Sequence, residues 1–306
     1  MLARSPHGVL GKIAVDLDRA AAARNARGAP GETTERLLAS GAGWSAADVL
    51  CTAGPGDRPF EERHSAVSVA VVVAGSFQYR SALGRDVMTP GSMLLGNDGQ
   101  CFECGHEHAV GDRCVAFRFA PDVFDRIAAD AGVARGERRF RAARLPPVRE
   151  SAALVARAAY GAVEPAAVSW EELAVELAAG AARLASRLTA RAGAAPAGAA
   201  ARVTRSVRAI ERQPGARWTL AELAAGAGLG AFHYLRTFRE LTGVTPHQFV
   251  MRARLREAAM RLAAEDGKVV EIALASGFDD LSNFNRAFRA EFGVAPGVYR
   301  RRGGRG

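Results

Sequence analysis

The chain has 306 residues, of which 49% are hydrophobic, and it carries a net charge of +9. This length favours two domains with a core each, and the composition excludes a disordered protein. Because the sequence has no apolar run of 18 residues and no signal peptide, we expect a cytoplasmic protein with no membrane partner.

Residues 1–43 are rich in Ala, Arg and Gly, and we expect them to form a loosely structured, partly helical extension. Residues 44–120 change to short apolar runs broken by turns. The expected strands are Val67–Val73, Phe77–Ser81, Ser92–Leu95 and Cys114–Phe119. Short strands at this spacing are typical of a small sandwich or barrel.

Helical periodicity takes over in residues 121–188. Its last helix has a stripe of leucines at helical spacing, which are Leu173, Leu177, Leu184 and Leu188. Such a stripe can belong to the core or to the seam of a dimer, and the sequence leaves both open. Residues 189–201 have the Ala/Gly/Pro texture of an interdomain linker.

Residues 202–300 contain one helical unit written twice. The copies are Leu223–Pro246, LAAGAGLGAFHYLRTFRELTGVTP, and Ile272–Pro296, IALASGFDDLSNFNRAFRAEFGVAP. Each copy predicts a helix-turn-helix, and residues 245–264 between them predict a helix roughly 30 Å long. Such a connector can hold two recognition helices in major grooves about one DNA turn, ~34 Å, apart.

The positive charge is concentrated in the same part of the chain. Residues 201–306 hold 18 Lys or Arg against 10 Asp or Glu, whereas residues 1–200 hold 23 against 22. A basic domain of this kind is the electrostatic footprint expected for contact with phosphates. Residues 301–306 form a basic tail.

The stretch Ile272–Arg300, IALASGFDDLSNFNRAFRAEFGVAPGVYR, resembles the most diagnostic part of the AraC/XylS family of bacterial transcription regulators. The resemblance covers residues 203–300. It implies an α+β protein with a cupin-like sensing barrel at 44–120 and a helical dimerisation or packing region at 121–188. An all-α DNA-binding domain with two helix-turn-helix units would follow at 202–300.

Carried over residue by residue, the resemblance implies a set of DNA contacts on the second helix of each helix-turn-helix unit. They are Phe232, Leu235, Arg236, Arg239, Leu281, Ser282, Asn283, Asn285 and Arg286. Arg can pair with guanine, Asn with adenine, and Leu or Phe with the thymine methyl group. The aromatic residues between them are expected to be core, and these are Tyr234, Phe238, Phe284 and Phe288.

The two copies differ at the start of their recognition helices. Gly230 precedes the first helix, where a Ser, Thr, Asp or Asn side chain would cap it better. The first copy also offers apolar side chains where the second offers Ser and Asn. We therefore expect more hydrogen-bonded base reading from the second copy and more apolar contact from the first.

All four cysteines lie in the first 114 residues, and four in a chain of this size exclude a disulfide-rich secreted scaffold. Cys104, His106, His108 and Cys114, with Cys101 nearby, form a candidate site for Zn²⁺ or another thiophilic metal. His64 and Glu62 are possible further ligands. Thiol redox sensing, a ligand pocket and a purely structural role are the alternatives.

We therefore expect a sequence-specific transcription regulator, not an enzyme, controlled by an effector that acts on the barrel. The expected partners are double-stranded DNA, a second copy of the chain, an unknown small-molecule or metal effector and, for an activator, RNA polymerase. The alternative is a metal-dependent cupin enzyme or a Cys-based alkylation sensor fused to a DNA-binding domain.

Overall fold

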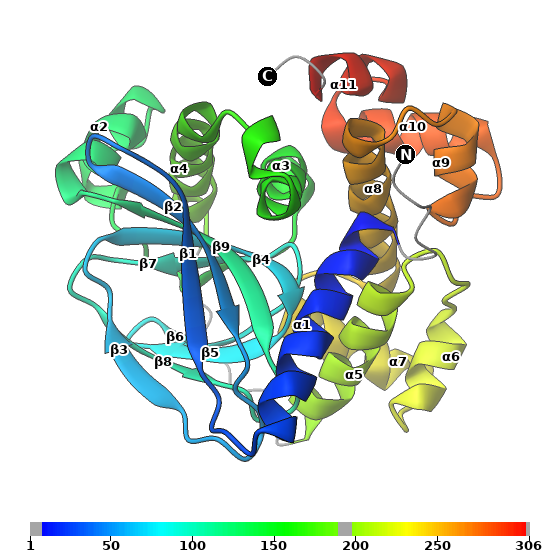
Figure 1. Ribbon diagram of the computed structural model, residues 1–306, viewed down its shortest axis with the longest axis horizontal. Helices are drawn as coiled ribbons and strands as arrows, with labels where there is room; N and C mark the ends of the chain where they lie inside the picture. The colour runs from blue at the N-terminus through cyan, green and yellow to red at the C-terminus, as the bar shows by residue number, and fades with distance from the viewer. Residues whose placement is uncertain (1–7, 189–197, 304–306) are drawn as a thin grey trace.

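The computed structural model describes residues 8–188 and 198–303, which form two halves that lie side by side (Figure 1). The N-terminal half contains two β-sheets with helices packed on one of them, and the C-terminal half is helical. This architecture confirms the predicted fold class. None of the helices in the described ranges is both long and apolar enough to cross a bilayer.

The strands of the described residues form two sheets in which every pairing is antiparallel. One sheet has the order β1-β2-β9-β4-β7-β10, and the other has the order β3-β8-β5-β6. The strands are β1 (Thr33–Gly41), β2 (Trp44–Cys51), β3 (Phe60–Arg63), β4 (Val67–Gly75), β5 (Phe77–Ser81), β6 (Gly84–Met88), β7 (Met93–Gly96), β8 (Cys101–Gly105), β9 (Asp112–Phe119) and β10 (Arg144–Leu145). Strands β4, β5, β7 and β9 confirm the four predicted ones.

Strand β4 is buried along its whole length. Burial on both faces explains why its sequence, VSVAVVVAG, is almost continuously apolar rather than alternating. Ala70 and Val72 belong to the core between the two sheets. Val69 and Val71 belong to the larger core between the six-stranded sheet and the helices.

Helices α2 (Pro121–Asp130), α3 (Ala152–Val163) and α4 (Trp170–Ser186) follow the strands, as predicted. Leu173 and Leu177 of α4 have no exposed surface and pack into the larger core. The leucine stripe therefore serves the core of the protein, and its interpretation as a dimer seam is wrong for these two residues.

The N-terminal segment corrects a prediction. Residues 1–43 were expected to be loosely structured and partly helical, but within residues 8–43 α1 (Val9–Ala26) is a packed helix of 18 residues and β1 pairs with β2 along its length. Leu10, Ile13 and Leu17 form a buried stripe on α1. Ala and Arg fill most of the other positions and dilute this stripe, so the helical period is hard to recognise in the sequence.

The C-terminal helices are α5 (Ala199–Arg212), α6 (Leu220–Gly226), α7 (Ala231–Thr242), α8 (Pro246–Ala264), α9 (Val269–Ala275), α10 (Leu281–Phe292) and α11 (Pro296–Gly303). The four helices of the two predicted units and the helix between them match the predicted positions to within one or two residues, whereas α5 begins inside the predicted linker and α11 was not predicted. Residues 189–197, which make up most of the predicted linker, lie outside the described residues.

Helix α8 joins the two halves through a buried carboxylate. Glu257 of α8 accepts hydrogen bonds from the backbone N–H groups of Val9 and Leu10, at 3.0 and 2.9 Å. A carboxylate at this position satisfies the unpaired N–H groups at the start of α1 and complements the helix dipole. Figure 1 shows α1 lying between the sheets and helices α5 and α8 as a result.

Helix α5 makes a second polar junction with the sheets. Arg208 donates to the carbonyl oxygens of Val110 and Gly111, the latter at 2.7 Å. Glu211 accepts from the N–H of Gly75 at 2.8 Å. The first helix of the C-terminal half is therefore hydrogen-bonded to the backbone where β4 ends and β9 begins.

A buried ion pair holds β2 and β9 together close to that junction. Asp48 accepts two hydrogen bonds from Arg113, at 2.8 and 2.7 Å, and one from Arg36 at 2.9 Å. Both arginines also donate to the carbonyl oxygen of Ala162 in α3. Burial raises the pKa of Asp48, but the two guanidinium groups outweigh burial and lower this pKa below its ordinary value.

We predict that Asp48→Ala lowers the free energy of unfolding by about 3 kcal/mol, because it leaves the Arg113 guanidinium buried without its carboxylate. The matched change Glu35→Ala removes the carboxylate that pairs with Arg118. Because this pair is more exposed to solvent, its loss should lower the free energy of unfolding by less than about 1 kcal/mol. Equilibrium unfolding in urea measures both, and equal losses would contradict the prediction.

The same ion pair predicts a pH dependence. Because the pKa of Asp48 is lowered in the folded protein, its stabilising contribution is present above its ordinary pKa of 3.8 and is lost as the pH falls through the lowered pKa. The difference in unfolding free energy between wild type and Asp48→Ala should be constant from neutral pH to about pH 5 and shrink in stronger acid. Urea titrations across this pH range would refute the account if the difference grew on acidification.

Candidate nucleic-acid interface and a buried cysteine–histidine cluster

Helices α6 and α7 form the first helix-turn-helix unit. Helix α6 begins at a capping box, in which Thr219 accepts from the N–H of Glu222 at 3.2 Å and Glu222 accepts from the N–H of Thr219 at 2.9 Å. Tyr234 and Phe238 of α7 have no exposed surface, and the Phe238 ring meets Phe249 of α8 edge-on. These aromatic contacts fix the orientation of α7 on α8.

The opposite face of α7 carries the residues predicted to meet DNA. Phe232 is 81% exposed, which is unusual for a side chain of this size. Arg236 and Arg239 are exposed, and Leu235 is half-buried at the edge of this face. Arg236 lies 3.6 Å from Glu240 on the same helix, so it is held only by a weak surface pair.

Helices α9 and α10 form the second unit, which is built on the same aromatic plan. Phe284 and Phe288 of α10 have no exposed surface. Their rings pack against Phe278 and Tyr299 with centroids 5.0 and 5.4 Å apart, respectively. All four aromatic residues that the repeat predicted to be core are therefore confirmed as core.

The exposed face of α10 is more polar than that of α7. Ser282, Asn283, Asn285 and Arg286 are exposed, and Leu281 is partly so. Arg286 donates to the amide oxygen of Asn283 at 3.1 Å. This face therefore presents a connected row of donors and acceptors of the kind that reads base edges.

The two recognition helices also start differently. Asp280 caps α10 by accepting from the N–H of Asn283 at 2.7 Å. Gly230 stands at the same position before α7 and has no side chain to do so. This difference confirms that the first recognition helix has the weaker cap.

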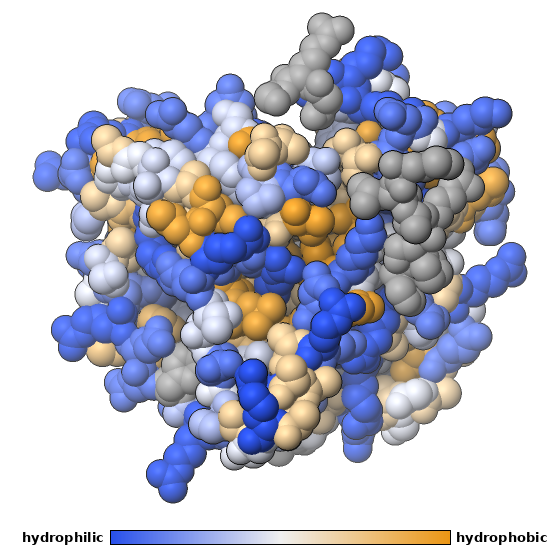
Figure 2. Space-filling view, viewed as in Figure 1, coloured by the Kyte–Doolittle hydropathy of each residue, from blue (hydrophilic) through white to orange (hydrophobic). Residues whose placement is uncertain are grey.

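Helix α8 separates the two units. Its 19 residues give a length of about 28 Å. In Figure 1, α6 and α7 lie beside its lower end, and α9 and α10 lie beside its upper end. Figure 2 shows the molecule from the same side as Figure 1. Hydrophobic residues reach the surface mainly near the centre of this view, and the rim is mostly hydrophilic.

A second candidate site lies inside the N-terminal half. Cys51, His106 and Asp112 each bring one potential metal-ligand atom to a point where all three atoms lie within 4.8 Å of one another. The Nε2 atom of His106 is 2.7 Å from Asp112 Oδ1. Cys114 donates its thiol hydrogen to Asp112 Oδ2 at 3.2 Å, and Cys104 faces the same interior. These five residues are called the buried cluster below.

Four of the five residues of the cluster are buried, and Cys104 is partly exposed. The side chain of His106 is 1% exposed, and that of Asp112 is 8% exposed. Burial raises the pKa of both the Cys104 and Cys114 thiols, and the nearby carboxylate of Asp112 raises each further. Burial lowers the pKa of His106, but hydrogen bonds to Asp112 and Cys51 outweigh it and raise this pKa to about 10.

The structure brings together some of the predicted metal ligands and separates others. Cys104, His106 and Cys114 lie in the cluster. His108 does not share it, Glu62 and Cys101 are exposed, and His64 instead pairs with the Tyr79 hydroxyl at 2.8 Å.

No pattern in the sequence pointed to Cys51 and Asp112 as members of this cluster. The two residues are direct partners in the β2–β9 register. Such a pairing between distant parts of the chain leaves no local spacing pattern. The only signal available was the acidic residue in the GDRC stretch that contains Cys114.

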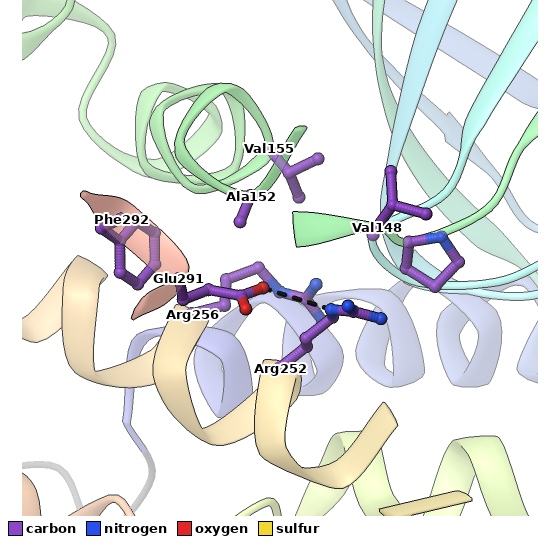
Figure 3. A pocket seen from close by; sticks show the side chains of 9 residues that line it. Val148, Ala152, Val155, Arg252, Arg256, Glu291 and Phe292 are labelled. Atoms are coloured by element: carbon purple, nitrogen blue, oxygen red, sulfur yellow. Dashed lines mark hydrogen bonds and ion pairs between the residues drawn. The ribbon is translucent and has the colours of Figure 1, made fainter. Parts of the chain in front are cut away.

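A small cavity lies between the two halves, among α3, α8 and α10 (Figure 3). Its charged wall consists of Arg252, Arg256 and Glu291. The Nε atom of Arg252 lies 3.2 Å from Oε1 of Glu291. Its volume of about 10 Å³ has room for a single water molecule. No small-molecule effector fits into it in this conformation.

Comparison with known proteins identifies the C-terminal half. Residues 223–302 match the family described as "Helix-turn-helix domain". The HTH-type transcriptional regulator MtrA of Neisseria gonorrhoeae is 32% identical over 98 residues, which are 32% of this chain and 33% of MtrA. The RCS-specific HTH-type transcriptional activator RclR of Escherichia coli (strain K12) is 35% identical over 96 residues, which are 31% and 34% of the two chains. The matched segment thus spans about a third of these relatives.

Solved structures resemble the chain in the same region or along most of it. The DNA-binding domain of AdpA, determined with a target DNA, is 28% identical and covers 33% of this chain and 90% of its own, with a TM-score of 0.32. ToxT from Vibrio cholerae, with an unsaturated fatty acid bound, is 12% identical and covers 86% and 96%, with a TM-score of 0.36.

The two faces of α7 predict effects of very different size on the free energy of unfolding. Phe238→Ala should lower the free energy of unfolding by about 4 kcal/mol, since it empties a fully buried ring position. Phe232→Ala changes the same residue type on the exposed face and should alter stability by less than about 0.5 kcal/mol. Chemical unfolding of both variants gives the test, and a large loss for Phe232→Ala would mean that its ring belongs to a core.

Proposed function

We propose that this protein, whose C-terminal half contains a helix-turn-helix domain of the AraC type, is a sequence-specific DNA-binding regulator of transcription. The observation that carries the proposal is the pair of recognition helices, each with a buried aromatic face and an exposed polar or basic face. Their attachment to the two ends of one rigid connector, α8, supports simultaneous binding in neighbouring major grooves.

The proposed DNA contacts are the exposed residues of the two recognition helices. Arg236, Arg286 and the two asparagines of α10 have the chemistry for guanine and adenine edges. Arg239, near the end of α7, suits a phosphate contact that sets the register of binding. Phe232 and Leu235 supply an apolar surface for thymine methyl groups, so the first unit reads more by shape and apolar contact than the second.

The proposal places control in the N-terminal half. The buried junctions that Glu257, Arg208 and Glu211 make with that half support a docked arrangement of the DNA-binding helices. An effector that changed the backbone at these junctions would change the placement of α5 and α8. We propose no catalytic activity, in keeping with the regulatory names of the relatives.

Further partners belong to the same proposal. They are a second copy of the chain and, if the protein activates transcription, RNA polymerase. The proposed location is the cytoplasm, where a bacterial regulator meets its DNA. Sedimentation of the full chain with and without DNA measures the contribution of a second copy.

We predict that Arg236→Ala and Arg286→Ala each weaken binding of the full chain to DNA from its own promoter region by about 5- to 100-fold, as expected for loss of one base or phosphate contact. Arg126→Ala in α2 removes the same charge from an exposed helix of the N-terminal half and serves as the control. Fluorescence anisotropy across a salt series measures the affinities.

Three results would contradict the proposal. The full chain could fail to bind this DNA with a salt-dependent affinity. Arg126→Ala could weaken binding as much as the two recognition-helix variants do. Arg236→Ala and Arg286→Ala could also leave both the affinity and its salt dependence unchanged.

A further inference from the structure

The buried cluster has a composition that a core alone does not require. Around it, the interior between the two sheets is made of apolar side chains such as Val72, Phe77 and Met88. An imidazole and a carboxylate in such surroundings are costly to bury. Their mutual hydrogen bond also leaves Nδ1 of His106 buried without a hydrogen-bond partner. That nitrogen lies across the ring from Asp112, whereas the convergence of a thiol, an imidazole and a carboxylate at one buried point indicates a missing partner.

The donor atoms of the cluster identify the chemical class of that partner. Thiolate sulfur, imidazole nitrogen and carboxylate oxygen together suit Zn²⁺ and related thiophilic cations. A Zn–S bond of about 2.3 Å places tetrahedral ligand atoms roughly 3.8 Å apart. Cys51, His106 and Asp112 already lie within 4.8 Å of one another, so small side-chain movements suffice.

We propose that the buried cluster binds one thiophilic divalent cation of the Zn²⁺ type, with Cys51, His106, Asp112 and Cys114 as its ligands. Asp112 is central, since its two oxygens lie 2.7 Å from His106 Nε2 and 3.2 Å from Cys114 Sγ. The ion replaces the thiol protons of Cys51 and Cys114 and the Nε2 proton of His106, and all three protons leave to solvent. Cys104 lies beside this set and lines the apolar side of the site.

The same residues connect the ion to the DNA-binding half. Asp112 directly follows Gly111, whose carbonyl oxygen accepts from Arg208 of α5. Asp112 also pairs in register with Gly75, whose N–H donates to Glu211 of α5. A change in the backbone at Asp112 therefore reaches the polar contacts that Arg208 and Glu211 make, while Arg212 of α5 pairs separately with Asp18 of α1.

The packing around this junction leaves little freedom for the backbone to absorb such a change. A Cβ atom added at Gly75 would lie 2.4 Å from the Gly111 carbonyl oxygen, and one added at Gly111 would lie 2.8 Å from the Cys51 carbonyl oxygen. On its other side, α5 packs its Val207 and Ile210 into the core that holds Tyr234 and Phe238 of α7. We infer that metal occupancy tightens the docking of α5 and thereby changes DNA affinity, a regulatory role that rests on the proposed function.

Metal titration of the reduced full chain tests the site. Zn²⁺ content is measured by elemental analysis, and Cd²⁺ serves as a spectroscopic probe through its thiolate charge-transfer absorption. Wild type should bind one equivalent. Cys51→Ser, Cys114→Ser and Asp112→Asn should each weaken binding by more than about 10-fold. Cys101→Ser changes an exposed thiol at the far end of β8 and should bind as wild type does.

Circular dichroism shows which variants keep the wild-type fold. If a cysteine variant unfolds, Asp112→Asn, which removes no sulfur, is used in its place to test metal binding. The proposal is overturned if reduced wild type binds no stoichiometric Zn²⁺ or Cd²⁺. It is also overturned if Cys101→Ser loses the metal while Cys51→Ser keeps it. A chain that responds only to oxidation of its thiols, and not to metal, overturns it as well.

Hydrogen exchange of the full chain tests the coupling without relying on DNA. In wild type, the amides of α5 should exchange at least about 10-fold more slowly with Zn²⁺ than without it. In Cys51→Ser, the exchange rates of these amides should be the same with and without Zn²⁺. DNA affinity is then measured in both states. Metal binding without DNA binding would refute the proposed function alone, whereas DNA binding with no metal and no change in α5 would refute the inference alone.

Discussion

Two adjacent buried charges on α8, Arg256 and Glu257, constrain the arrangement of the whole molecule. Burial lowers the pKa of Arg256 to about 10, an effect that the carboxylates of Glu211 and Glu257 oppose. Glu257 accepts hydrogen bonds from the first N–H groups of α1, so separating α8 from the N-terminal half breaks both bonds and leaves the start of α1 uncapped. The helix that spaces the two helix-turn-helix units is thus also the helix that ties them to the sheets.

This double attachment gives the N-terminal half two routes to the DNA-binding surface. Along one route, α1 contacts β4 on one side and α5 and α8 on the other. Along the other, the backbone at Gly75 and Gly111 holds Arg208 and Glu211 of α5 directly. Asp112 of the buried cluster lies beside the start of the second route, so the binding proposed there would need no movement of a whole domain to change the contacts of α5.

Local sequence patterns predicted much of this structure because they report local physics. The aromatic core residues of the two repeated units are set by residues three to four positions apart, and all four of them were found. Glu257 could not be assigned a partner, because the residues it contacts lie at the other end of the chain. Cys51 and Asp112 were missed for the same reason, since only the β2–β9 register brings them together. His108 was included because alternation along a strand places it with His106, whereas β8 ends at Gly105 before either residue.

The central claim is that α8 presents two reading surfaces about one turn of DNA apart. Selection of binding sites from a random DNA duplex pool by the full chain measures this spacing directly. The account predicts two conserved clusters of base pairs whose centres lie about 10 base pairs apart, on one side of the duplex. A single conserved cluster, or two clusters separated by a half-integral number of turns, would contradict it.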